Sequence, residues 1–126
     1  IVSTHSFPEI AVRGQPAAGV ETAIPELIVH GEHPITDGLA DKTRFPAAVF
    51  EHKDHRHFSY EGRTLEPGPK GQVLVRNGSG DPVLVAGQVG KGRVVLSGFY
   101  YGTGGATEGP ERRIYEGALR WIAWDR

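Results

Sequence analysis

Histidine and acidic side chains crowd one short segment of the chain, EHKDHRH at residues 51–57. It contains three of the six histidines in the sequence, His52, His55 and His57. Imidazole and carboxylate groups both bind zinc, and in a strand His55 and His57 would point to the same side. The spacing matches no zinc signature, however, and a lysine and an arginine bring two positive charges into the segment, which repel a divalent ion. The pattern therefore favours a solvated loop or edge segment without a metal, and a metal site formed by the three histidines is the alternative.

The other three histidines lie close to predicted strands. His5 follows Ser3 and Thr4, but neighbours in sequence are poorly placed to form a Ser–His pair, and no acidic partner can be identified. His30 and His33 follow an apolar segment, and ligands of open α/β sheets gather at the carboxyl ends of strands. We assign no catalytic residue and predict a ligand-binding role for the following residues: His5, His30, His33, Tyr100 and Tyr101.

A glycine-rich segment, YYGTGGATEGP at 100–110, leads into the predicted C-terminal helix. Backbone N–H groups at such a helix start can bind an anion. The segment has no phosphate-binding or dinucleotide-binding pattern, and Glu108 beside the helix start would repel phosphate. We therefore predict a flexible loop there and no cofactor.

The composition excludes several kinds of chemistry. The chain has no cysteine, which rules out disulfides, thiolate metal sites and a cysteine nucleophile, and which gives no indication of the cellular compartment. A formal net charge of −1 gives no electrostatic reason to expect nucleic acid or an anionic membrane as a partner. No apolar run approaches the roughly 20 residues that a membrane-spanning helix needs.

Apolar runs and turn residues predict the elements that must position these side chains. Strands are predicted at 24–30, 46–52, 71–77, 81–90 and 93–102, with a minor strand near 58–60 inside a long polar loop that ends near residue 71. Gly90-Lys91-Gly92 predicts a hairpin between the last two strands. Because both of these strands are continuously apolar, we expect them to be covered on both faces.

A helix is predicted from about Pro110 to the end of the chain. Proline fits the first turn of a helix, and Ile114, Ala118 and Ile122 recur every four residues. We expect Leu119 and Trp121 to pack with Ile114 on the sheet.

The segment HPITDGL, at 33–39, follows the first predicted strand. We predict a structural corner, in which His33 and Pro34 end the strand, Asp37-Gly38 forms a tight turn, and Leu39 enters the core.

The order of three segments adds a family resemblance. HPITDGL, then DPVLVAGQVGKGRVVLSGFYYG, then RRIYEGALRWIAW resembles the carboxyl-terminal half of class I glutamine-amidotransferase-like domains, closest to the trehalose-utilisation (ThuA-like) branch, over about residues 24–124. The resemblance implies an α/β, flavodoxin-like three-layer domain, or its C-terminal part, with a short mixed sheet, a β-hairpin and a C-terminal helix. We expect residues 1–126 to form a single amidotransferase-like domain. Because the chain starts at Ile1 and has no methionine, we expect this domain to be a fragment of a longer chain.

The resemblance also shapes the expected function. An amidotransferase needs a cysteine nucleophile, and this chain has none, so we expect a non-catalytic module. It would bind a small polar ligand, with a carbohydrate implied by the resemblance, or mediate assembly with the rest of its own polypeptide or another subunit. One alternative is a hydrolase or isomerase acting on sugars, with a histidine-containing site with or without a metal. Another is a structural fragment completed by a partner chain, since partial folds leave unpaired strand edges.

Overall fold

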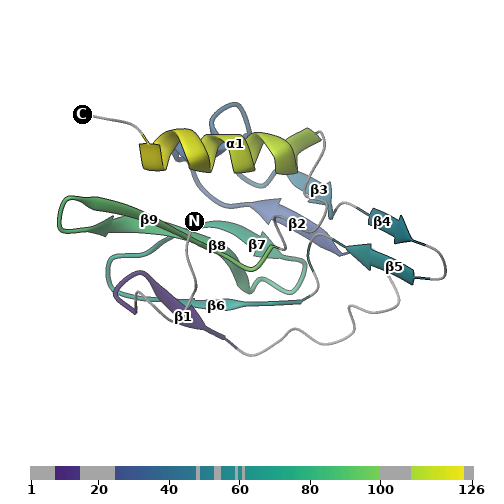
Figure 1. Cartoon of the computed structure of the whole chain (residues 1–126), viewed down its shortest axis with the longest axis horizontal. Helices are drawn as coiled ribbons and strands as arrows, with labels where there is room; N and C mark the ends of the chain where they lie inside the picture. The colour runs from purple at the N-terminus through teal and green to yellow at the C-terminus, as the bar shows by residue number, and fades with distance from the viewer. Residues whose placement is uncertain are drawn as a thin grey trace.

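The computed structural model describes residues 8–14, 25–47, 49–52, 55–58, 60, 62–99 and 109–123, of which 49–52, 55–58, 109 and 111 are described by their backbone. The fold is mixed α/β, with antiparallel strands and one C-terminal helix (Figure 1). The described elements are, in chain order, β1 Ala11–Arg13, β2 Glu26–Val29, the short 3₁₀ helix η2 Pro34–Thr36, β3 Arg44–Pro46, β4 Val49–His52, β5 His55–Phe58, β6 Leu65–Pro67, β7 Gln72–Asn77, β8 Pro82–Val89, β9 Gly92–Ser97 and α1 Gly109–Ala123.

The main sheet has five strands in the order β3-β2-β7-β8-β9, and each of its pairings is antiparallel. The predicted hairpin is confirmed, because β8 and β9 pair from Leu84↔Ser97 to Val89↔Gly92. Gly90 supplies the positive φ, +60°, that this tight turn requires.

Both faces of the main sheet are covered, as the apolar runs of the hairpin predict. On one face, Leu84 and Val95 belong to a core that includes Ile114 of α1. On the other face, Val85 and Leu96 pack with apolar residues of β1 and β6. Figure 1 shows α1 on one side of the sheet and the β1–β6 ribbon on the opposite side.

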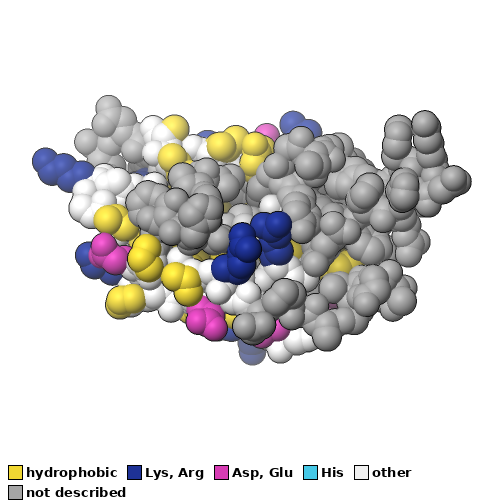
Figure 2. All heavy atoms as spheres, turned by 60° about the horizontal axis from the view of Figure 1, so that its bottom comes forward, with side chains coloured by type: hydrophobic (Ala, Val, Ile, Leu, Met, Phe, Trp, Pro, Cys, Tyr) yellow, Lys and Arg dark blue, Asp and Glu magenta, His cyan; other side chains and the backbone are white. Residues whose placement is uncertain are grey.

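The outer surface on the β1–β6 side is mixed in character. Figure 2 shows hydrophobic side chains there next to charged side chains of both signs. Within the described residues, no helix is both long and apolar enough to cross a membrane.

The polar segment 51–71 contains more regular structure than its sequence predicts. β4 and β5 form a hairpin in which Glu51 lies opposite Arg56 and His52 lies opposite His55. β6 pairs with β1, which lies far away in the sequence, so no local signal marks it. The predicted strand at 46–52 overlaps β4, whereas the predicted loop is wrong over β5 and β6.

The C-terminal helix is confirmed, but one predicted contact is wrong. Its buried residues are Ile114, Gly117, Ala118 and Trp121, at positions i, i+3, i+4 and i+7. Leu119 lies one position beyond Ala118, about 100° around the helix, and is 46% exposed. Leu119 therefore points away from the sheet.

The corner at HPITDGL is present, and its details differ from the prediction. Gly38 adopts the positive φ of a tight turn, +86°. The residue that fills the core is Ile35, which is 1% exposed, whereas Leu39 is partly buried and packs against the core from its margin. Pro34 starts a 3₁₀ turn, and this turn places Ile35, four residues before Leu39, in the core.

Candidate functional site

The corner η2 and the helix α1 pack against each other at a glycine. A Cβ on Gly117 would contact the carbonyl oxygen of Ile35 and lie 3.0 Å from its carbonyl carbon. Only glycine permits this approach of two backbones. The contact fixes the corner relative to the helix, and Gly117 itself lines one of the hollows described below.

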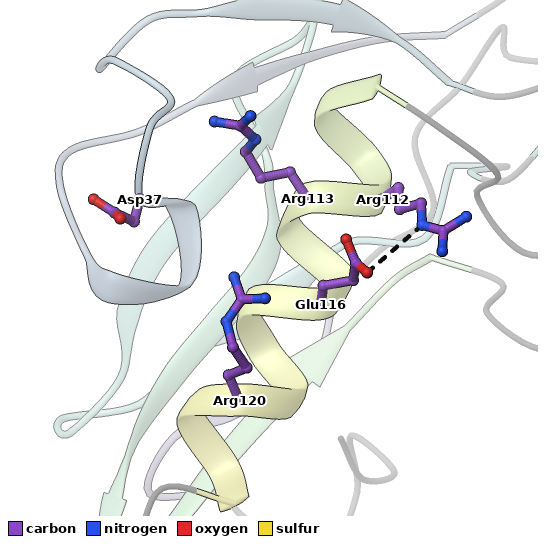
Figure 3. A pocket seen from close by; sticks show the side chains of 5 residues that line it. All are labelled: Asp37, Arg112, Arg113, Glu116 and Arg120. Atoms are coloured by element: carbon purple, nitrogen blue, oxygen red, sulfur yellow. Dashed lines mark ion pairs between the residues drawn. The ribbon is translucent and has the colours of Figure 1, made fainter.

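A polar groove of about 430 Å³ lies between the η2 turn and α1, and we call it the arginine groove (Figure 3). Its lining consists of Asp37, Arg112, Arg113, Glu116 and Arg120. Arg113, Glu116 and Arg120 follow the spacing i, i+3, i+7 and so share one face of the helix. In Figure 3, Arg113 and Arg120 extend from α1 on the side of the η2 turn, where Asp37 lies.

Two of these side chains form an ion pair. Arg112 Nε lies 3.7 Å from Glu116 Oε2, and both side chains are about half exposed. An exposed pair of this kind contributes little to stability, so it does not by itself explain why the residues are there. Figure 3 shows Arg112 on the other side of the helix from Arg113.

A glycine also shapes the wall formed by the turn. A Cβ on Gly38 would overlap the guanidinium of Arg113, with Cζ only 3.5 Å away. The arginine therefore lies directly over the backbone of the turn. Two glycines thus set the spacing between the η2 turn and α1: Gly38 where the turn meets the Arg113 guanidinium, and Gly117 where the helix meets Ile35.

Two further hollows adjoin the corner. One, of about 490 Å³, is lined mainly by apolar residues and shares Arg120 with the arginine groove: Pro34, Gly117, Arg120, Trp121 and Ala123. The other, of about 610 Å³, follows the corner itself and includes His33, Thr36 and Leu39. The HPITDGL segment is thus both a structural corner and the rim of three adjoining hollows.

His33 is held at this corner by contacts on several sides. Its Nδ1 accepts a hydrogen bond from the N–H of Ile35 at 3.1 Å, which caps η2. Its ring meets Trp121 edge to face, with 4.9 Å between centroids. Arg93 lies over the same tryptophan, with Cζ 4.9 Å from the ring centroid, and donates from Nη1 to the Trp121 carbonyl at 2.9 Å.

The environment of His33 favours its neutral form. Burial, together with the positive charge of Arg93, lowers the pKa of His33 below its ordinary value of 6.5. The cap adds a geometric reason, because a protonated Nδ1 cannot accept the hydrogen bond from Ile35.

The free energy of unfolding is therefore expected to fall as the pH decreases from 6.5 toward the lowered pKa of folded His33. In this window the unfolded chain binds a proton and the folded chain does not, so acid favours unfolding; above pH 6.5 the stabilisation is fully present. Urea melts at about pH 7.5 and about pH 5.5 measure the effect. The control is His33→Asn, because asparagine is a good helix cap that does not titrate. The same pH dependence in both proteins would assign the effect to groups other than His33.

The structure brings one of the predicted ligand residues to this site. His33 lines the hollow along the corner, whereas His30 is exposed, accepts a hydrogen bond from Arg76 Nε at 3.4 Å, and lines none of the three hollows. His5, Tyr100 and Tyr101 lie outside the described residues. The arginines were not predicted as site residues, although their spacing on the polar face of the predicted helix is a visible signal.

That the histidine segment at 51–57 holds no metal stays a prediction. The described hairpin fixes the backbone of His52, His55 and His57, with His55 and His57 two residues apart on β5. Among the residues whose side chains are described, no group of three or more His, Asp or Glu could hold a metal ion.

Comparisons with known proteins return no family model, no curated protein and no solved structure that matches this chain.

Proposed function

We propose that this chain is a non-catalytic binding module and that the arginine groove is its site for a small polar ligand. The supporting observation is that three of the lining side chains have no hydrogen-bond or ion-pair partner among the described residues. Within the described part of the chain, the side chains of Asp37, Arg113 and Arg120 form no hydrogen bond or ion pair, and they lie around one hollow. Their hydrogen-bonding groups are therefore available to a ligand.

The chemistry of the lining suits a ligand rich in hydroxyl groups. A guanidinium donates hydrogen bonds and a carboxylate accepts them, so the groove can satisfy both functions of a hydroxyl group. A carbohydrate, the ligand class that the family resemblance implies, has this chemistry. The lack of cysteine argues against a glutaminase reaction at any site in this chain.

We also propose that the amidotransferase-like resemblance holds for the fold. Its support is that the three segments of the resemblance correspond to η2, the β8–β9 hairpin and α1. The described strand pairings are all antiparallel, whereas a flavodoxin-like three-layer domain is built on a mostly parallel sheet. The proposed three-layer fold therefore requires parallel strands in addition to the described ones.

The proposed setting is a larger protein, in which the partner is the rest of the polypeptide or another subunit. Among the described strands β9 pairs with β8 alone. An edge strand of this kind can accept a further strand.

A titration with neutral sugars, sugar acids and sugar phosphates, followed by amide chemical shifts in NMR spectra, tests the binding site. At least one compound is expected to bind saturably and to shift amides of the η2 turn and of α1. Arg120→Gln is expected to weaken that binding about tenfold, the value of one charge-assisted hydrogen bond.

The matched control is Arg44→Gln. Arg44 is an exposed arginine on β3 that pairs with Glu26 and does not line the groove, so its replacement should leave binding unchanged. The proposal is wrong if no compound binds, or if the shifted amides lie away from η2 and α1.

A further inference from the structure

We propose that the ligand of the arginine groove is an acidic, hydroxyl-bearing small molecule, whose phosphate or carboxylate group binds one of the two guanidinium groups of Arg113 and Arg120 and whose hydroxyl groups reach the other. This inference rests on the function proposed above and names the ligand class.

The charges that line the groove favour an anion. Three guanidinium groups lie there with two carboxylates. Glu116 is already paired with Arg112, which leaves Arg113 and Arg120 on α1 with Asp37 on the η2 turn. The part of the groove between η2 and α1 therefore carries an excess of one positive charge.

The two arginines have unused donors. Neither Arg113 nor Arg120 forms a side-chain hydrogen bond or ion pair with another described residue. Each guanidinium presents five N–H donors in a planar fork, which matches the oxygens of a carboxylate or a phosphate. Arginine is the preferred residue for such groups, since it stays charged and binds with two parallel hydrogen bonds.

The walls of the groove hold the arginines at a defined separation from the turn. Gly38 lets the Arg113 guanidinium lie over the turn, and Gly117 brings α1 against Ile35. Arg113 and Arg120 are seven residues apart on the helix, which corresponds to about 10 Å along its axis. A bare inorganic ion is small for that span, whereas a sugar-sized molecule fills it.

The carboxylates specify the rest of the ligand. Asp37 carries two oxygens that accept hydrogen bonds and donate none, so a ligand group facing it must be a donor. A hydroxyl group is a donor that carries no charge, and it would let the acidic group lie on an arginine, away from Asp37. Both features together describe a sugar phosphate or a sugar acid.

Calorimetric or NMR titration with glucose 6-phosphate, glucuronate, glucose and inorganic phosphate tests the inference. Glucose 6-phosphate or glucuronate is expected to bind at least about tenfold more tightly than glucose and than inorganic phosphate. The better of the two identifies phosphate or carboxylate as the acidic group. Added salt should weaken this binding, because the arginines are exposed and screened.

The variants separate the roles of the two walls. At least one of Arg113→Gln and Arg120→Gln should reduce the preference for the acidic sugar over glucose, and Arg44→Gln should not. Asp37→Asn should strengthen binding of the acidic sugar, since asparagine keeps an acceptor oxygen and removes a like charge.

The outcomes distinguish this inference from the function on which it rests. Glucose binding in the groove as tightly as glucose 6-phosphate and glucuronate overturns the acidic ligand and leaves the binding module intact. Inorganic phosphate binding as tightly as either acidic sugar overturns the hydroxyl-bearing part. Acidic sugars that bind without amide shifts at η2 and α1 overturn both proposals.

Discussion

Replacing Trp121 with alanine is expected to lower the free energy of unfolding by about 3–5 kcal/mol. Trp121 is 7% exposed and belongs to the main core, and it also touches the ring of His33 and the guanidinium of Arg93. Its loss leaves a cavity between α1 and the corner that the surrounding backbones cannot fill. Urea or guanidinium melts of the two proteins measure the difference.

Leu119→Ala is the matched control, on the same helix two residues away. Because Leu119 is 46% exposed, its truncation should change the free energy of unfolding by about 0.5 kcal/mol or less. A larger loss for Leu119 than for Trp121 would mean that α1 packs on the sheet through a different face.

The orientation of this helix illustrates what the sequence could predict and what it could not. The spacing of Ile114 and Ala118 predicts a helix with one apolar face, and the structure contains that helix. The centre of the face was misjudged because Gly117 has no side chain and therefore adds nothing to a count of apolar residues. Its burial against Ile35 moves the contact face toward Gly117 and away from Leu119.

The strands divide according to how much of their signal is local. β7, β8 and β9 carry apolar runs and turn residues of their own, so they are visible in the sequence. β1 and β6 are three residues long and exist as a pair, in which Ala11 lies opposite Pro67. A strand that depends on a partner far away in the chain has little pattern to detect. β4 overlaps the predicted strand at 46–52, whereas the polar sequence of β5 does not mark that strand.

The candidate site combines a predictable part with an unpredictable one. The corner at HPITDGL and the helix were each predicted, as was His33 as a residue near a pocket. Their contact was not predicted, because nothing in the sequence near Asp37 indicates that a helix more than seventy residues later packs beside it. Asp37 and the arginines become one groove only in the folded chain.

Gly117→Ala is expected to lower the free energy of unfolding by about 1–3 kcal/mol, as overpacking does in well-packed cores. In an isolated helix the same change would stabilise by about 1 kcal/mol, since alanine is the better helix former. Here the new Cβ would contact the Ile35 carbonyl oxygen and lie 3.2 Å from the Ile35 Cα. These are backbone atoms that cannot rotate away, so the corner or the helix must move.

A glycine in open space provides the control for this substitution. The nearest atom to a Cβ on Gly78 is the carbonyl oxygen of Glu26, at 3.9 Å, and Gly78 does not have a positive φ. Gly78→Ala should therefore leave the free energy of unfolding unchanged or raise it by about 0.4–1 kcal/mol. Denaturant melts of both variants test the pair together. A gain in stability for Gly117→Ala similar to that of an isolated helix would mean that η2 and α1 do not meet at this point. In that case η2 and α1, which form the walls of the arginine groove, would lack the contact that fixes their relative position.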